Sequence, residues 1–318
     1  MSAKQTGKGL LFFAPLQGFT EAPYRKAHHE VCGGVDAYYA PFARLEKGEI
    51  RKKDLRDLSF DFPCPLIPQV IAADAEEFER LTRAVMAQGY THIDFNLGCP
   101  FPMQTRAGRG AGLLPHPDRL QAIGEAMTAL AAEAPGLSFS VKMRLGLESA
   151  DESLALLPVL NALPLAHITL HPRLGKQQYK GPVDLLACQR FLEQSEHPVV
   201  DKGVLRTLAD AEGAIKDMPG RHGLSIGRGW WARPTLAAEI KSGHTLPEAE
   251  VRRAVLQIHE RVFADYSRTL EGGDAQILQK MLPFWEYQEP LFGHKAVKLI
   301  RKSRSLQDYR SAVLSLSR

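Results

Sequence analysis

The stretch "HIDFNLGCPFPMQTRAGRGAGLLPHPDRLQAIGEAMTALAAEAPGLSFSVKMRLG", residues 92–146, contains a complete strand, helix and second strand. Residues 92–98 and 138–146 are short runs with β-branched or aromatic residues, which predict strands. Residues 117–136 between them have helical spacing, with Gly136 as a stop signal. A strand, a helix and a strand in this order are typical of a parallel β-sheet.

The same alternation extends along most of the chain. Helical patterns separate the strand-like runs, for example residues 74–89 with Asp74 as the N-cap. The eight runs are residues 10–18, 36–42, 65–72, 92–98, 138–146, 166–173, 197–203 and 223–229. Eight such repeats predict an α/β fold, the (β/α)8 or TIM barrel. A doubly wound open sheet is the alternative.

The end of the chain differs from the repeats in pattern and in charge. No strand-like run follows residue 229, and residues from about 247 read as helices, so we expect a barrel over residues 1–243 and a small helical domain over 244–318. Residues 241–318 hold thirteen Lys/Arg and nine Asp/Glu, which accounts for the whole net charge of +4. This asymmetry indicates a polyanion such as RNA as partner, with a solvated basic helix face as the alternative.

Composition narrows the classes of protein that fit. Hydrophobic residues make up 44% of the 318 residues, and no stretch approaches the roughly 18 apolar residues of a membrane span. The N-terminus lacks a signal-peptide pattern, so we expect a cytoplasmic location and no membrane partner. Four widely spaced cysteines predict neither a zinc site nor a disulfide framework. Any special cysteine therefore acts alone.

Polar residues follow the predicted strands at their carboxyl ends, where TIM barrels build their sites. They are Gln17, Gln69, Asn96, Cys99, Lys142, Arg144, His171, Arg173, Lys202 and Arg228. Strand periodicity places Ser140, Lys142 and Arg144 on one face, toward the barrel mouth. Lys142 has three readings that spacing leaves open: a Schiff-base nucleophile, a partner of an anionic ring, or a solvated cation.

Glycines follow the last two strands, where barrels commonly bind phosphate. Gly203, Gly227 and Gly229 stand there with Arg228, which predicts a phosphorylated cofactor or substrate. Neither a G-x-G-x-x-G opening a helix nor a P-loop motif occurs, so a Rossmann domain and a P-loop are not indicated.

Seven motifs together resemble the dihydrouridine synthases, flavoenzymes that reduce uridine in tRNA. In order they are "APLQGFTEAPYR" (14–25), "PQVIA" (68–72), "DFNLGCPFP" (94–102), "GAGLLPHP" (110–117), "SVKMRLG" (140–146), "HPRLGKQQYKG" (171–181) and "SIGRG" (225–229). Another flavin barrel, such as dihydroorotate dehydrogenase, would share the phosphate loop but hardly N-x-G-C-P and V-K-x-R-x-G together.

The resemblance implies FMN at the barrel mouth, reduced by NADPH and donating a hydride from N5 to C6 of the uracil. Cys99 would then protonate C5 as a general acid, since an unperturbed thiol with a pKa near about 8.5 is mostly protonated at neutral pH. The reading as a buried small hydrophobe suits Cys32, Cys64 and Cys188 better.

The resemblance also assigns binding roles. The implied flavin contacts are Pro15, Leu16, Gln17, Gln69 and Lys142 at the ring, and His171, Lys202, Gly203, Val204, Gly227 and Arg228 at the phosphate. Asn96 and Arg144 would meet the flipped uridine or its neighbours. Tyr179 either touches substrate or packs its loop. Lys298, Arg301 and Lys302 would bind RNA phosphates.

Two positions depart from the family pattern. Lys202, Gly203 and Val204 stand where the family usually has N-G-D or N-G-E, and Val204 offers no side-chain hydrogen bond. Pro172 follows His171 where a glycine is frequent. The expected protein is a monomeric tRNA-dihydrouridine synthase without a metal. The alternatives are a flavin barrel that acts on a small molecule, and an RNA-binding homologue that has lost catalysis.

Overall fold

The computed structural model describes residues 9–58, 64–203 and 205–317 of the chain. Contacts between Cα atoms divide the chain into two compact units. The first unit comprises residues 1–15, 36–203 and 214–225, and the second comprises residues 16–35, 204–213 and 226–318. Each unit is built from segments that lie far apart in the sequence.

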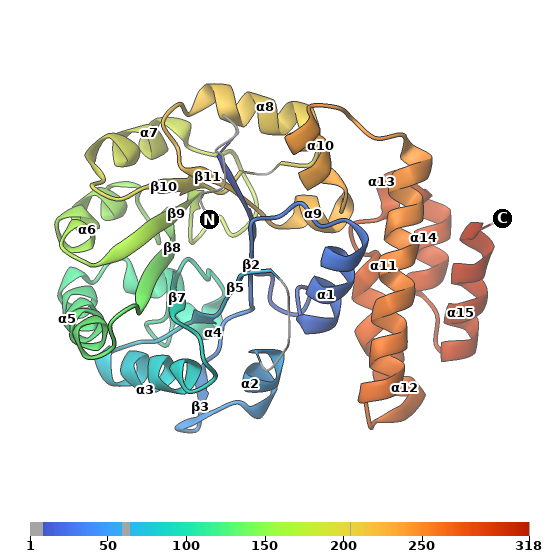
Figure 1. Ribbon diagram of the computed structural model, residues 1–318, viewed down its shortest axis with the longest axis horizontal. Coiled ribbons are helices and arrows are strands. Elements are labelled where there is room, and N and C mark those ends of the chain that lie inside the picture. Colours follow the sequence, from blue (N-terminus) through green and yellow to red (C-terminus); the bar gives the residue numbers. More distant parts are fainter. Residues whose placement is uncertain (1–8, 59–63, 204, 318) are drawn as a thin grey trace. The chain divides into compact units, whose positions relative to one another are not determined.

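The first unit is a parallel barrel whose helices lie outside the strands (Figure 1). In the described part of the chain the strand order is β5, β2, β1, β11, β10, β9, β8, β7, β6. Their bounds are β1 Leu10–Phe13, β2 Ala37–Tyr39, β5 Leu66–Ile67, β6 Gln69–Val70, β7 His92–Leu97, β8 Ser138–Gly146, β9 Leu165–Leu174, β10 Val199–Asp201 and β11 Gly223–Ile226. The predicted TIM-barrel fold is confirmed, and the open doubly wound sheet is wrong.

Pro68 explains why eight predicted strands become nine segments. It divides the third predicted strand into β5, which pairs with β2, and β6, which pairs with β7. Proline has no N–H for the ladder, but its carbonyl accepts the N–H of Asp94 at 2.9 Å. The ring therefore closes through the third strand.

Helices follow the strands as the alternation predicts. They are α2 Lys52–Leu58, α3 Ala75–Met86, α4 Pro102–Thr105, α5 Pro117–Glu133, α6 Asp151–Asn161, α7 Leu185–Gln194 and α8 Leu208–Asp217, with a hairpin of β3 Leu45–Glu46 and β4 Glu49–Ile50 and a 3-10 turn η1 at Gly110–Leu113. Asp74 caps α3 by accepting the Glu77 N–H at 2.9 Å, as predicted. Helix α5 ends at Glu133, and Gly136 lies in the turn beyond it with φ +95°.

The alternation of side chains in β8 separates an apolar layer from a polar one. Val141 and Met143 are buried in the apolar cluster that also contains Ile123 and Leu156 of the surrounding helices. Lys142 and Arg144, on the opposite face of the strand, are also buried. The barrel interior therefore holds charged side chains at the carboxyl ends of its strands.

The second unit is helical (Figure 1). Its elements are α1 Ala22–Val31, the first part of α8, α9 Arg228–Ala232, α10 Leu236–Ser242, α11 Glu248–Thr269, α12 Gly273–Met281, η2 Leu282–Trp285, α13 Glu289–Phe292, α14 His294–Arg301, α15 Leu306–Leu314 and η3 Ser315–Ser317. Trp231 joins α9 to the C-terminal helices, because its Nε1 donates to the Phe284 carbonyl at 2.8 Å and its carbonyl accepts from Gln288 Nε2 at 2.6 Å.

The C-terminal helices thus share a unit with residues 16–35 and 226–243. The functional division into a catalytic domain, 1–243, and an RNA-binding domain, 244–318, stays a prediction. None of the helices in the described ranges combines the length and apolar character needed to cross a membrane. The described residues also contain no group of three or more His, Cys, Asp or Glu arranged to hold a metal ion.

Candidate active site

A chain of hydrogen bonds runs across the carboxyl ends of β6 and β7 to the Cys99 loop. The Asn96 Oδ1 atom accepts the backbone N–H groups of Gly98 at 3.0 Å and Cys99 at 2.9 Å. Asn96 Nδ2 donates to Gln69 Oε1 at 2.6 Å, and Gln69 Nε2 donates to Asp94 Oδ2 at 2.6 Å. The position of the cysteine loop is therefore tied to a carboxylate inside the barrel.

The direction of this chain is fixed by its two ends. Backbone N–H groups can only donate, so the oxygen of the Asn96 amide must face the loop and its nitrogen must face Gln69. The same logic turns the Gln69 oxygen toward Asn96 and its nitrogen toward Asp94. Asp94, as a carboxylate, accepts at this end, and it also accepts from Ser140 Oγ at 2.6 Å.

Asp94 is completely buried, and burial raises the pKa of its carboxyl to about 7. Its bonds from Gln69 and Ser140 and the charge of Lys142 act in the opposite direction. The ionised form is thus stabilised by a small number of specific partners. Loss of any one of them favours protonation.

Cys99 is buried, with 7% of its surface exposed, beside Phe42 and Ile71. Burial raises the pKa of the Cys99 thiol above its ordinary value, against the opposing effects of the Phe101 backbone and then of Lys142. The thiol is therefore protonated at neutral pH, as a proton donor requires.

Burial alone does not single out Cys99 among the cysteines. Cys64 and Cys188 are also buried, whereas Cys32 is partly exposed. What distinguishes Cys99 is its place at the end of β7 and the hydrogen bonds that hold its loop.

Gly110 explains the glycine-rich segment that follows the cysteine. A Cβ atom at this position would lie 2.9 Å from the Cys99 Cβ and 2.8 Å from the Cys99 carbonyl oxygen, and the backbone φ is +59°. The next residue, Ala111, donates its N–H to that carbonyl at 3.0 Å. Only glycine fits this contact without displacement, so Gly110 supports the back of the cysteine loop.

Arg144 is buried and joins two loops at the mouth of the barrel. Its Nε donates to the Gly98 carbonyl at 2.9 Å, and its Nη1 donates to the carbonyls of Leu174 at 2.9 Å and Gln178 at 2.7 Å. Its guanidinium lies 5.5 Å from the centre of the Tyr179 ring. Arg144 thus fixes the Cys99 loop relative to the loop after β9.

Positive charge dominates the carboxyl ends of the three neighbouring strands β8, β9 and β10. The buried basic side chains are Lys142, Arg144, His171, Arg173 and Lys202. Burial, and next the charge of Arg144, lower the pKa of Lys142, while Asp94 raises it. Burial and then Lys202 hold the pKa of His171 well below its usual range. A buried surplus of positive charge is costly unless an anion compensates it.

His171 supplies a second sign of a missing partner. Its Nδ1 atom is buried and has no hydrogen-bond partner within the part of the chain that the structure describes. Buried polar atoms are nearly always hydrogen-bonded. The residues present therefore fit an anionic group with hydrogen-bonding atoms, such as the phosphate of a cofactor.

The predicted site residues are distributed over both units. Pro15, Gln69, Asn96, Cys99, Lys142, Arg144, His171, Lys202 and Gly203 belong to the first unit, and Leu16, Gln17, Gly227 and Arg228 belong to the second. Val204 lies outside the described residues. The predicted RNA contacts Lys298, Arg301 and Lys302 are exposed at the end of α14, whose buried residues are Val297 and Ile300.

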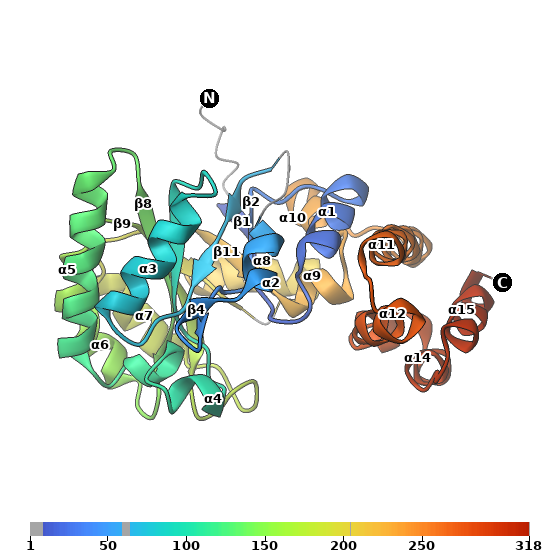
Figure 2. The same cartoon turned by 90° about the horizontal axis from the view of Figure 1, so that it is seen from below.

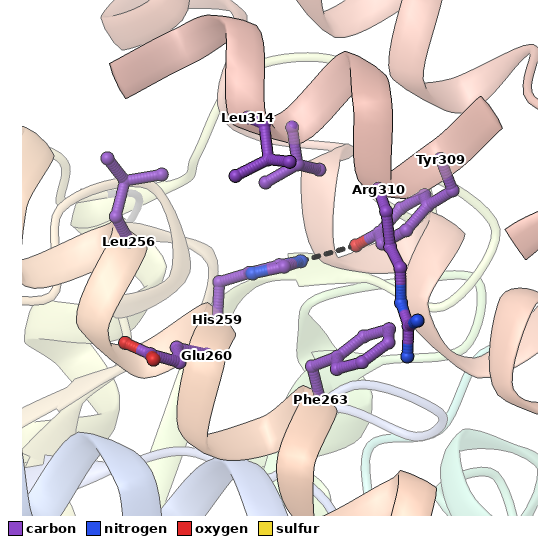
Figure 3. Close-up of a pocket in the computed structure, with 8 residues that line it drawn as sticks. Leu256, His259, Glu260, Phe263, Tyr309, Arg310 and Leu314 are labelled. Carbon is purple, nitrogen blue, oxygen red and sulfur yellow. Dashed lines mark hydrogen bonds between the residues drawn. The ribbon is translucent and has the colours of Figure 1, made fainter. Parts of the chain in front are cut away.

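A cavity of about 400 Å³ lies in the second unit between α11 and α15 (Figure 3). His259 Nε2 and the Tyr309 hydroxyl are hydrogen-bonded at 2.6 Å across it, and the Arg310 guanidinium lies 4.9 Å from the centre of the Phe263 ring. Burial lowers the pKa of His259 to about 4, so this histidine is neutral. None of the predicted site residues lines this cavity.

Asp94, Ser140 and Gly110 were not among the predicted site residues. A signal for the first two exists, because strand periodicity puts Asp94 on the same face as Asn96, and Ser140 on the same face as Lys142. The register of β7 and β8 pairs Asp94 with Ser140 and Asn96 with Lys142. The sequence alone does not reveal which residues are hydrogen-bonded to Asp94, and these hydrogen bonds place Asp94 in the site.

The closed parallel barrel, with a buried thiol and a surplus of positive charge at the carboxyl ends of its strands, has the architecture of the TIM-barrel class. A family model described as "Dihydrouridine synthase (Dus)" matches residues 12–289. The chain belongs to this family.

Curated relatives carry the name of this family, and a solved structure agrees with the barrel fold. tRNA-dihydrouridine synthase B of Escherichia coli is 26% identical over 270 residues, which cover 82% of this chain and 82% of the relative. The probable tRNA-dihydrouridine synthase of Mycobacterium tuberculosis is 32% identical over 244 residues, which cover 73% and 62%. Morphinone reductase, at 9% identity, aligns with a TM-score of 0.54 over 76% of this chain and 88% of its own, which shows the barrel fold alone.

Proposed function

We propose that the protein is a flavin-dependent tRNA-dihydrouridine synthase that uses FMN and NADPH and protonates the substrate with Cys99. Family membership supports the reaction. The main observation in favour of a cofactor with a phosphate group is the cluster of buried basic side chains around His171 Nδ1. Bound FMN, once reduced by NADPH, supplies a hydride from N5 to C6 of the uracil.

Lys142 and the phosphate contacts hold the cofactor. Lys142 would bind the ring, and its positive charge would stabilise the electron-rich reduced form. His171 and Lys202 would bind the phosphate, together with the backbone of Gly203, Gly227 and Arg228 that the resemblance to the family assigns to it. In the sequence, Val204 stands where the family usually has an acidic residue. Lys202, two residues earlier, would supply positive charge for the phosphate.

The proton comes from Cys99. The Asn96 amide binds the Cys99 N–H, and Gly110 packs directly against Cys99. Both contacts would fix the direction from which the thiol meets C5 of the uracil. Burial keeps the thiol protonated. The new C5–H bond takes the thiol proton while C6 takes the hydride, which balances the reduction of the C5–C6 double bond, and solvent reprotonates the thiolate.

The proposed RNA contacts are of two kinds. Asn96 and Arg144 meet the extruded uridine, and Arg144 does so while its Nε and Nη1 hold the two loops in place. Lys298, Arg301 and Lys302 bind phosphates without reading sequence. A cytoplasmic, monomeric protein fits these roles.

The test begins with the purified protein. A yellow preparation that releases FMN, bleaches with NADPH under anaerobic conditions and regains its colour with unmodified tRNA supports the proposal. Recovery of colour with free uridine instead would favour a flavin barrel that acts on a small molecule. A colourless protein that binds tRNA and does not take up added FMN would favour an RNA-binding homologue, which the altered loop at Lys202 makes the second candidate.

A further inference from the structure

Three large apolar side chains are exposed beside the cysteine loop. They are Phe101 (47% exposed), Met103 (72%) and Tyr179 (37%), here called the aromatic rim. The rings of Phe101 and Tyr179 contact each other, with centres 6.5 Å apart. Single exposed apolar residues are ordinary on a protein surface, but three of them together beside a candidate active site are typical of a binding surface.

The rim is positioned by the same residues that hold Cys99. Phe101 is the N-cap of α4, two residues after Cys99, and α4 lies at the end of the barrel where β7 terminates (Figure 2). Tyr179 follows Gln178, whose carbonyl is held by Arg144. Since Arg144 also holds Gly98, the thiol and the rim have a fixed relation within the first unit.

Basic side chains accompany the rim. Arg44 Nη1 contacts the Met103 sulfur at 3.4 Å, and its charge opposes the burial that raises the pKa of the Cys99 thiol. Arg106, at the C-cap of α4, is exposed. Aromatic side chains next to guanidinium groups are a combination that binds unpaired nucleic acid, through base stacking and phosphate contacts.

We propose that the aromatic rim binds the unpaired nucleobase next to the uridine that enters the active site, with Phe101 as its stacking partner. The inference rests on the proposed function. When a uridine leaves the base stack, its neighbour loses a stacking partner, and the rim restores one at that place. A protein seated on the rim would cover the approach to Cys99, so the substrate RNA is the occupant compatible with turnover.

The kinetic test compares Phe101→Ala, Phe101→Leu and Phe101→Tyr, with Leu186→Ala as the control. Leu186 is 75% exposed on α7 and lies outside the rim. Stacking of one base is worth about 1–3 kcal/mol, so Phe101→Ala should raise the tRNA concentration for half-maximal flavin reoxidation about 10-fold. Phe101→Leu should behave like Phe101→Ala, Phe101→Tyr should restore binding, and the rate of flavin reduction by NADPH should not change in any variant.

A direct test uses an unmodified tRNA transcript with 2-aminopurine beside the uridine that the wild-type enzyme reduces. Binding should quench this fluorophore, and Phe101→Ala should lose the quenching. Equal quenching and equal tRNA dependence in wild type and Phe101→Ala would overturn the inference. If the wild-type holoenzyme reduces no uridine in tRNA, the proposed function fails first and the inference falls with it.

Discussion

The Nε2 atom of Gln69 donates a hydrogen bond to the Oδ2 atom of Asp94 at 2.6 Å inside the barrel. This bond is the inner end of the chain that leads through Asn96 to the backbone of Cys99. Each amide in the chain has one orientation that satisfies its neighbours, so a group at position 94 that donated to Gln69 would reverse both amides and oppose the backbone N–H groups of the cysteine loop.

Asp94→Asn should therefore loosen the Cys99 loop. The introduced amide can accept from Gln69 only if the Ser140 hydroxyl turns and accepts from the amide nitrogen, and the substitution also removes the negative charge beside buried Lys142. Loss of a charged hydrogen-bond acceptor costs about 1–3 kcal/mol, so the apoprotein should lose this much stability and Cys99 should be alkylated by iodoacetamide about 10-fold faster. Peptide mapping by mass spectrometry gives the rate at each cysteine.

A second substitution tests the polarity argument. Gln69→Glu added to Asp94→Asn supplies a carboxylate that accepts from both neighbouring amides, so slow alkylation should return. Asp36→Asn is the control, because Asp36 accepts a backbone N–H from Leu11 outside the chain of hydrogen bonds. If Asp94→Asn and Asp36→Asn leave Cys99 equally protected, the chain of hydrogen bonds does not position the loop.

Gly110→Ala should impair catalysis without loss of flavin. The added Cβ meets the Cβ and carbonyl of Cys99 at less than 3.0 Å, and overpacking of this kind costs about 1–3 kcal/mol. Gly136→Ala is the matched control, since Gly136 also has a positive φ, +95°, but has no heavy atom within 4 Å of the added Cβ. Comparable dihydrouridine formation by the two variants would remove Gly110 from the support of the loop.

His28 should make the stability of the second unit sensitive to pH. Its Nε2 donates to the Pro234 carbonyl at 3.0 Å, and burial lowers its pKa to about 3. The pKa of such a histidine is lower in the folded protein than in the unfolded chain, where it is about 6.5. Its contribution to the free energy of unfolding is therefore complete above the unfolded pKa and is lost as the pH falls toward the folded pKa.

Between pH 7 and pH 5 the expected loss from His28 is about 2 kcal/mol. His28→Gln keeps an N–H donor but does not titrate, so its unfolding free energy should fall by about 2 kcal/mol less than that of the wild type. Urea unfolding at the two pH values measures the difference, and the other buried histidines cancel in the comparison. Parallel pH profiles for the two proteins would show that His28 does not titrate as proposed.

Neutralising Lys298, Arg301 and Lys302 with glutamine should weaken tRNA binding and reduce its dependence on salt. Each lost phosphate contact lowers the slope of log K against log salt by about 0.7 to 0.9. Arg83, Arg190 and Lys216, on the outer helices α3, α7 and α8, provide a control with the same change of net charge. A slope that falls equally in both triple variants would mean that net charge, rather than the end of α14, determines the affinity.

The barrel can be predicted from the sequence because the signals for its strands and helices are local. Each strand and each helix carries its own periodicity, and Asp74 acts as the predicted cap. The predicted strands extend beyond the observed ones at several ends, for example residues 197–203 against Val199–Asp201. Loop residues after a barrel strand remain extended without ladder partners, so their composition resembles that of a strand.

The site is less accessible to prediction because its interactions are not local. Periodicity places Lys142 and Arg144 on the inner face, but the three carbonyls that bind Arg144 come from two other loops. Asp94 reads in the sequence as one polar residue in a strand. Its role depends on the register that brings Gln69 and Ser140 to its two oxygens. Likewise, composition does not reveal that residues 16–35 pack in the same unit as the C-terminal helices.

The central claim is that Cys99 donates the proton that completes reduction of a uridine in tRNA. The most direct measurement is a single anaerobic turnover in which NADPH-reduced holoenzyme, wild type or Cys99→Ala, is mixed with unmodified tRNA and dihydrouridine is counted by mass spectrometry. We predict dihydrouridine with the wild type, and a Cys99→Ala protein that keeps its flavin but forms product at least about 100-fold more slowly. Formation of dihydrouridine by Cys99→Ala at the wild-type rate would contradict the account.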